Sequence, residues 1–107
     1  MTTTQIMDPV LTRFRVALDD LYGSRIARVV LFGSRARGDA RADSDYDVAV
    51  FLRDLPDRFA ELDRLADLST EIIAETGEFV HAMPYRIEAY EDRTPLMREI
   101  RREGVVL

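Results

Sequence analysis

Hydrophobic positions repeat along the chain with two periods, a helical one of three to four residues and a strand period of two. The segment after Asp8 and Pro9 has the helical period, and this pair is typical of an N-cap followed by the first helical residue. Gly23 is a typical helix stop. The predicted inward face of this helix consists of Val10, Leu11, Phe14, Ala17, Leu18 and Leu21.

Two later segments also have the helical period. A long helix is predicted to open at Pro56 and to end at Gly77. Its predicted inward face consists of Phe59, Leu62, Leu65, Leu68, Ile72 and Ile73. A last helix is predicted over Leu96–Glu103, after Thr94 and Pro95.

Three short apolar segments rich in β-forming residues predict strands at Val29–Phe32, Tyr46–Leu52 and Phe79–Tyr85. Residues 35–44 predict a loop, with a short helix opening at Ser34, and residues 105–107 form an apolar tail. The order α-β-α-β-α-β-α predicts an α/β (α+β) fold, in which a three-stranded mixed sheet is covered by helices. At 107 residues we expect a single domain, 1–107.

The composition excludes several kinds of site. There is no cysteine, so disulfides, thiolate metal sites and cysteine nucleophiles are excluded. The one histidine, His81, excludes a multi-histidine metal cage, and the absence of lysine excludes Schiff-base chemistry. No apolar run approaches the roughly 18 residues of a membrane span. The N-terminus also lacks the features of a secretion signal, so we expect a cytoplasmic protein without membrane association.

Charge is distributed unevenly along the chain. A net charge of −5 argues against loose binding to duplex nucleic acid. Residues 24–41 nevertheless hold five arginines and one aspartate, whereas residues 54–78 hold eight acidic residues and two arginines. Such runs are as often solvated surface as functional, but the basic segment makes an acidic mimic of DNA a poor interpretation.

A pair of aspartates at the start of the second predicted strand carries the first chemical signal. Alternation along a strand places Asp45 and Asp47 on the same face, where two carboxylates repel each other unless a cation lies between them. Mg²⁺ commonly binds through one or two carboxylates and substrate phosphates. An Asx turn is the ordinary alternative for such a segment.

The end of the first predicted strand carries the second signal. Gly33 allows a close approach of backbone to ligand, Ser34 offers a hydroxyl group, and the side chains of Arg35 and Arg37 suit phosphate oxygens. If the first two strands are antiparallel neighbours, Ser34 lies near both aspartates. We therefore expect a nucleoside triphosphate beside its metal ions, although a Gly-Ser pair after a strand is more often only a turn.

Gly33-Ser34, ten residues, and then Asp45-x-Asp47 resembles the signature of the DNA polymerase β-type nucleotidyltransferase superfamily. The longer string LFGSRARGDARADSDYDVAVFL resembles the minimal nucleotidyltransferases (MNT), the antitoxins of HEPN/MNT toxin–antitoxin pairs. The resemblance covers about residues 26–85 and the closing REIRREGVVL. It implies that Gly33 and Ser34 hold ATP and that Asp45 and Asp47 bind Mg²⁺, with two ions. It also implies transfer of AMP to a tyrosine of a HEPN-type ribonuclease toxin.

The third predicted strand departs from the family pattern, in which many members carry a third carboxylate there. The segment Phe79–Tyr85 contains no acidic residue, and Glu78 at its start is the best substitute. A long helix between the second and third strands predicts that they are parallel, which places Glu78 near Asp45. If Glu78 faces the site, alternation puts His81 on the opposite face, as a structural histidine. A solvated glutamate at the turn is the alternative for Glu78.

Three functions stay open at this point. The first is a Mg²⁺-dependent nucleotidyltransferase acting on a protein partner, because a chain of this length has no room for an acceptor domain. The second is a non-catalytic antitoxin that acts by complex formation, and the third is a nucleotide-binding sensor. Residues 86–107 either dock the partner or close the core, and Tyr85 and Tyr90 either pack or accept the nucleotide themselves.

Overall fold

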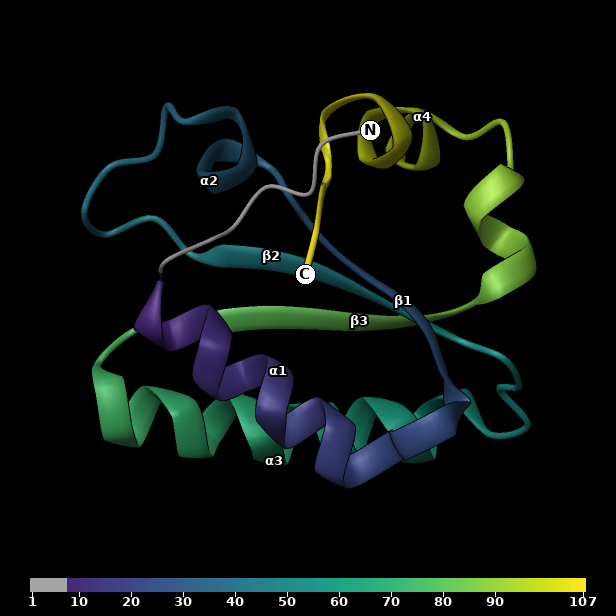
Figure 1. The fold of residues 1–107 in the computed structure, drawn as a ribbon, viewed down its shortest axis with the longest axis horizontal. Coiled ribbons are helices and arrows are strands. Elements are labelled where there is room, and N and C mark those ends of the chain that lie inside the picture. Colours follow the sequence, from purple (N-terminus) through teal and green to yellow (C-terminus); the bar gives the residue numbers. More distant parts are fainter. Residues whose placement is uncertain (1–7) are drawn as a thin grey trace.

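A computed structural model describes residues 8–107, which form a four-stranded sheet with helices on both faces (Figure 1). The strands are β1 (Ile26–Phe32), β2 (Tyr46–Leu52), β3 (Val80–Arg86) and β4 (Val105–Val106). Their order across the sheet is β3-β2-β1-β4. As the sequence predicts, β1 and β2 are antiparallel and β2 and β3 are parallel.

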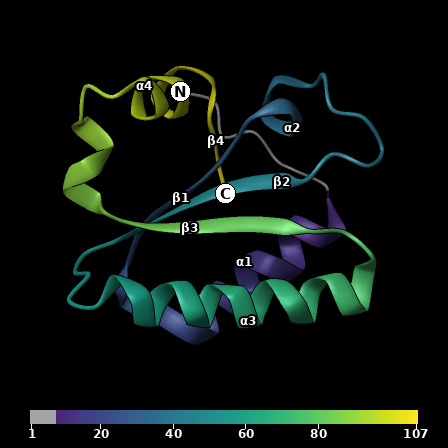
Figure 2. The ribbon, with the colours of Figure 1, turned by 180° about the vertical axis from the view of Figure 1, so that it is seen from behind.

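The helices form two layers (Figures 1 and 2). One layer contains α1 (Pro9–Tyr22) and the long α3 (Arg58–Thr76). The other contains α2 (Ser34–Arg37), α4 (Pro95–Glu103) and the 3₁₀ turn η2 (Ile87–Glu91). A shorter 3₁₀ turn, η1 (Gly23–Arg25), joins α1 to β1.

Side-chain caps fix where the helices begin. The Asp8 carboxylate accepts hydrogen bonds from the amides of Val10 (2.8 Å) and Leu11 (3.4 Å) at the start of α1. Thr94 caps α4 in the same way through the Met97 amide, at 3.2 Å. The long helix starts two residues later than the opening predicted at Pro56, because Asp57 caps α3.

A fourth strand is the main correction to the predicted fold. The apolar tail pairs with β1, with Val105 opposite Leu31 and Val106 opposite Val30. The Leu107 amide extends this ladder with a hydrogen bond to the Val29 carbonyl, at 2.9 Å. A strand of two residues is too short to show an alternation of its own, so the sequence pattern alone did not predict it.

The alternation of the strands divides the core into two parts. The part under α1 and α3 contains even-numbered residues of β2, such as Val48 and Val50. The part under α4 contains Ala49 and Phe51 of β2, which pack with Met97 and Ile100 of α4. Burial of these two α4 residues means that the helix closes the core.

Tyrosines at the end of β3 and in η2 also belong to the α4 side. Tyr85 and Tyr90 both pack on Phe51, with ring centroids 5.7 and 5.4 Å away. Guanidinium groups also lie over these rings, Arg58 over Tyr85 and Arg28 over Tyr90. These contacts favour the packing interpretation of both tyrosines over nucleotide acceptance.

Three predicted inward residues are instead exposed. Phe59 is 79% exposed, and Leu21 and Ile73 are each 41% exposed. Tyr22, four residues after Leu18, is buried in place of Leu21 because it continues the same helical stripe. The buried face of α3 includes Glu61, 3% exposed, which the side chains of Arg25 and Arg64 neutralise at 3.1 and 3.0 Å.

The outer edge of β3 is closed by side chains of α3. The Val80 carbonyl accepts a hydrogen bond from the Ser69 hydroxyl at 2.6 Å, and the Pro84 carbonyl accepts one from Arg58 at 2.8 Å. Pro84 has no amide hydrogen to offer. Little of this edge therefore remains for another strand.

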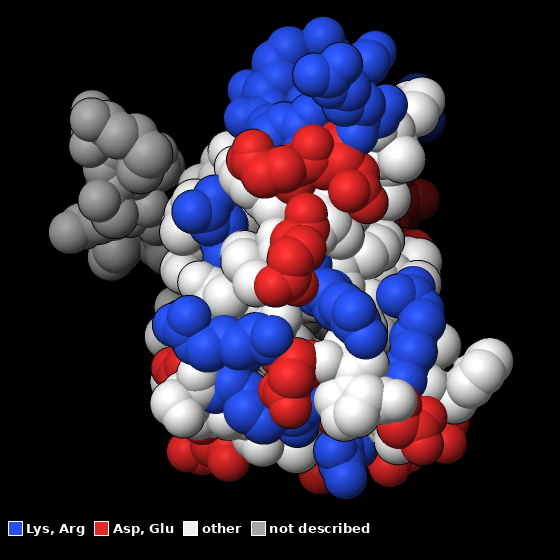
Figure 3. Space-filling model, turned by 90° about the vertical axis from the view of Figure 1, so that its right-hand side faces the viewer, with Lys and Arg blue, Asp and Glu red and all other residues white. Residues whose placement is uncertain are grey.

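Charged side chains are unevenly distributed along the sequence, and they are also grouped in space on the surface. Figure 3 shows basic side chains gathered at the end of the molecule where α4 lies. The α4 sequence itself contains three arginines, Arg98, Arg101 and Arg102. No helix of residues 8–107 is long and apolar enough to cross a membrane.

Candidate active site

The end of β1 and the start of β2 meet at Asp47. Phe32 is the register partner of Asp47, so Gly33 follows directly beside this carboxylate. Gly33 has φ +77° and ψ −159°, a conformation that is essentially restricted to glycine. A Cβ atom at this position would lie 2.5 Å from Asp47 Oδ2. Gly33 is therefore required both by its backbone angles and by the carboxylate packed on it.

Ser34 follows Gly33 and opens α2, as the sequence predicts. The Gly33 carbonyl accepts hydrogen bonds from the amides of Ala36 and Arg37, both at 3.1 Å, which fold the chain back into a single helical turn. Ser34 is half-buried and directly follows Gly33, the residue that packs against the Asp47 carboxylate.

Asp45 precedes β2 and is exposed. The Tyr46 amide donates to the Phe79 carbonyl at 3.0 Å, so the β2–β3 ladder begins directly after Asp45. By strand alternation Asp45 then lies on the same face as Asp47, the α4 face. Within residues 8–107, Asp45 has no hydrogen-bond or ion-pair partner in the protein.

The two carboxylates suit a divalent cation whose remaining coordination positions are filled by a bound ligand. Among the described residues, no group of three or more His, Asp or Glu side chains gathers to hold a metal. Asp47 is 35% exposed on its side chain and no arginine pairs with it. Two such carboxylates on one face suit Mg²⁺, which keeps water and phosphate oxygens in its remaining positions.

Arg37 and Arg35 lie on different sides of the sheet. Arg37 points toward α4, where it pairs with Glu99 at 3.8 Å, and it also bonds Asp39 at 3.2 Å. Arg35 instead lies over the ring of Tyr46, with its guanidinium carbon 3.9 Å from the ring centroid. Tyr46 belongs to the α1 side of β2, so the structure does not bring Arg35 to Asp47.

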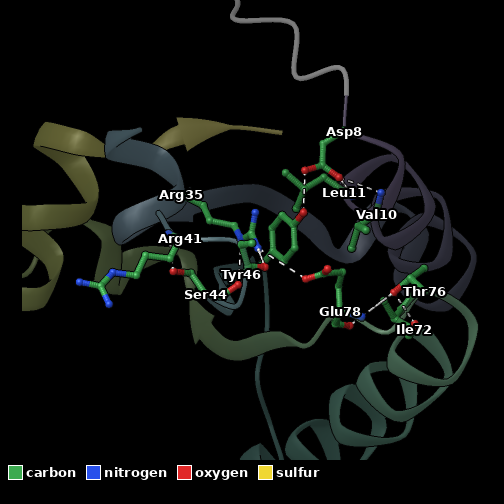
Figure 4. A network of polar contacts seen from close by, with 11 residues as sticks. Asp8, Val10, Leu11, Arg35, Arg41, Ser44, Tyr46, Ile72, Thr76 and Glu78 are labelled. Carbon is green, nitrogen blue, oxygen red and sulfur yellow. Dashed lines mark hydrogen bonds and ion pairs between the residues drawn. The ribbon is translucent and has the colours of Figure 1, made fainter. Parts of the chain in front are cut away.

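Arg35 holds the loop that joins α2 to β2 (Figure 4). Its guanidinium donates to the carbonyls of Ser44 at 2.9 Å and Ala42 at 3.3 Å. Tyr46, beneath it, donates its hydroxyl hydrogen to Asp8 at 2.7 Å. Burial and this hydrogen bond raise the pKa of Tyr46 to about 12. The network joins α1, α2 and β2 directly behind the aspartate pair.

Glu78 belongs to the same network as Arg35. Its carboxylate lies 3.5 Å from the Arg35 guanidinium, and its amide bonds Thr76 (Figure 4). Glu78 and Val80 are two residues apart in an extended segment, so their side chains point to the same face of the sheet. The Val80 side chain is buried in the α1 side of the core. The structure therefore does not place Glu78 beside Asp47.

His81 lies on the face where the sequence interpretation placed Glu78. Parallel register pairs His81 with Asp47, and His81 Nδ1 is 3.7 Å from Asp47 Oδ1. The expected arrangement was wrong because it rested on Glu78 facing the site, and a strand allows only one parity on each face. A correct register between the second and third strands would have found His81 from the sequence.

Comparisons with known proteins agree on one family. The family described as "Polymerase beta, Nucleotidyltransferase" matches residues 20–107. The "Putative protein adenylyltransferase MJ0604" of Methanocaldococcus jannaschii is 29% identical over 102 residues, which cover 94% of this chain and 96% of the relative.

Solved structures of similar fold include two kinds of protein. A structure of a minimal nucleotidyltransferase, itself described as putative, has a TM-score of 0.57 at 25% identity and covers 99% of this chain and 100% of its own. A crystal structure of a toxin–antitoxin with AMP-PNP has a TM-score of 0.62 at 20% identity and covers 88% of this chain and 69% of its own. At that identity the second match concerns the fold alone.

Proposed function

Because this chain belongs to the polymerase beta nucleotidyltransferase family, we propose that it is an antitoxin that transfers AMP from Mg-ATP to a partner protein. The acceptor is a hydroxyl group, a tyrosine side chain, of a HEPN-type ribonuclease toxin. The observation that carries the proposal is the Asp47 carboxylate packed on Gly33, with Asp45 on the same face.

Each part of the site has a role in this reaction. Asp45 and Asp47 would hold Mg²⁺, as two ions, and the ions when bound neutralise phosphate charge and activate the acceptor oxygen. Gly33 and Ser34 accommodate the β- and γ-phosphates, because a side chain at position 33 would occupy the space beside Asp47. Arg37 lies on the same side of the sheet and is the arginine available to these phosphates.

The transfer balances without a further reactant. The acceptor oxygen forms a bond to the α-phosphorus of ATP, and the bond from that phosphorus to the β-phosphate oxygen breaks. Pyrophosphate leaves with the bonding electrons, and the acceptor hydroxyl proton passes to solvent. The chain itself positions the reactants and supplies the carboxylates.

The descriptions of two similar proteins support a toxin as the partner. The full-length relative named above is described as a protein adenylyltransferase, and one structural neighbour is a toxin–antitoxin. The chain offers no separate domain within residues 8–107 for binding an acceptor. An acceptor that arrives as a folded partner is consistent with this architecture.

A second candidate function is neutralisation by complex formation alone. The observation that favours it is the position of Glu78, which pairs with Arg35 on the other side of the sheet from Asp47. In this arrangement Glu78 does not supply a third carboxylate beside the aspartates, and neutralisation by binding a toxin needs no such carboxylate.

Transfer of labelled AMP separates the two functions. The chain is incubated with α-labelled ATP, Mg²⁺ and the protein encoded beside it, and the variant D45N/D47N serves as the control. We expect label on the partner that is lost in this variant, whereas E78Q retains it. A stable complex without label under any nucleotide would leave complex formation as the function.

A further inference from the structure

Two aromatic side chains lie next to the aspartate pair. Phe79 directly precedes β3 and His81 lies within it, two residues later, and their rings are stacked with centroids 6.2 Å apart and an interplanar angle of 19°. In the register of β2 and β3, His81 is beside Asp47 and Phe79 is beside Asp45. One face of the sheet therefore carries two carboxylates and two stacked rings side by side.

This aromatic pair is open to solvent. Phe79 is 38% exposed, and the His81 side chain is 56% exposed. The α4 core residues pack on Val30, Ala49 and Phe51, farther along the sheet, and do not include the pair. Both rings are therefore accessible to a molecule that is bound at the aspartates.

The geometry of the transfer decides which reactant lies over the pair. In an in-line displacement the attacking oxygen and the leaving oxygen lie on opposite sides of the phosphorus. Gly33 and Ser34, the phosphate side of the proposed site, belong to the β1 side of Asp47. β3 lies on the other side of β2, so an attacking hydroxyl enters from above Phe79 and His81.

On the basis of the proposed function, we propose that Phe79 and His81 form an acceptor shelf. On this shelf the aromatic ring of the acceptor tyrosine stacks while its hydroxyl group reaches the metal-binding aspartates. The pair selects a tyrosine over a serine or threonine, because only an aromatic acceptor covers the exposed rings. The shelf therefore determines which acceptor side chain is used, whereas ATP binding depends on Gly33, Ser34 and the two aspartates.

The first arm of the test measures transfer kinetics with the partner protein. F79A is expected to raise the KM for the acceptor about three- to tenfold, the range of one aromatic pair, with the KM for ATP within about twofold of wild type. F79W is expected to restore the acceptor KM. The matched control is F59A, because Phe59 is the most exposed phenylalanine and lies near the opposite end of β3. A rise in the KM for ATP instead would assign the pair to the nucleobase and overturn the proposal.

The second arm does not depend on catalysis. His81 is the only histidine, so its Hε1 proton gives a single, directly assignable imidazole signal in NMR spectra. With Mg²⁺ and a non-hydrolysable ATP analogue present, N-acetyl-tyrosinamide is expected to shift this signal in wild type and in F59A but not in F79A. N-acetyl-serinamide is expected to leave it unshifted.

The two arms separate the two proposals. Absence of label on the partner, together with a tyrosinamide-dependent shift, would refute the transferase function and support the shelf. Label on the partner, together with equal shifts from both amides, would support the transferase and refute the shelf. A tyrosinamide shift that persists in F79A would also refute it.

Discussion

Replacing Gly33 with alanine is expected to damage the site more than the fold. The φ angle of +77° at Gly33 costs an alanine residue about 1–3 kcal/mol. The new Cβ atom would also lie 2.5 Å from Asp47 Oδ2, about 1 Å inside ordinary van der Waals contact. Because Asp47 is partly exposed, its carboxylate relieves the overlap by moving rather than by disrupting the core.

Gly38 provides a matched control for this substitution. Its φ angle is +83°, and a Cβ atom there would meet nothing within 4 Å. G38A therefore carries a comparable backbone cost, about 1–2 kcal/mol, without any effect on Asp47. The two variants should unfold within about 2 kcal/mol of each other in urea.

Binding of Mg-ATP separates the two variants. A displacement of about 1 Å in a metal-binding carboxylate is comparable to the loss of a supporting residue, which costs about 10- to 100-fold in metal affinity. Calorimetric titration with Mg²⁺ and a non-hydrolysable ATP analogue is expected to show this loss in G33A and wild-type affinity in G38A. Equal affinity in the two variants would refute the argument that Gly33 is required by its contact with Asp47.

Three further predictions concern stability. D8A removes the cap of α1 and the acceptor of the Tyr46 hydroxyl, so urea unfolding should show a loss of about 2–4 kcal/mol, whereas loss of the cap alone would give about 1 kcal/mol. Since the pKa of Tyr46 is raised to about 12, the unfolded chain releases this proton first as the pH rises. The free energy of unfolding should therefore fall between pH 10 and pH 12, by about 2–3 kcal/mol from this group. Y46F should show a shallower decline with pH, and an unchanged decline in Y46F would contradict the raised pKa of Tyr46. Burial works against ionisation of Glu61, but the Tyr22 hydroxyl, Arg25 and Arg64 outweigh it, so the pKa of Glu61 is lowered. The contribution of Glu61 to the free energy of unfolding is therefore present above pH 4.5 and is lost as the pH falls further. E61Q should lose about 1.5–3 kcal/mol at pH 7 and should lose less than wild type on acidification, as measured by denaturant unfolding at both pH values.

The sequence predicts the central strand and its antiparallel pairing with β1 well. The range Tyr46–Leu52 is the same in prediction and structure, because this strand is buried on both faces and bounded by polar residues. The adjacency of Gly33 and Asp47 follows from an antiparallel pairing, which the sequence also predicts.

Other features depend on contacts that a linear pattern does not contain. Phe59 has the helical period but is 79% exposed, whereas Glu61, two residues later in the same helical turn, is buried in its place. Arg35 has the composition of a phosphate ligand, yet the ring of Tyr46 and two loop carbonyls hold it behind the site. Which face His81 occupies depends on the register between β2 and β3, which the sequence does not specify.

The closed edge of β3 limits how this protein assembles with others. Ser69 and Arg58 occupy the carbonyls that a neighbouring strand would need, and Pro84 lacks the corresponding donor. Pairing two copies of the chain edge to edge through β3 would therefore break both of these hydrogen bonds. A partner that approaches β3 must do so through side chains on the faces of the sheet, so its recognition depends on the identity of those side chains rather than on shared backbone geometry.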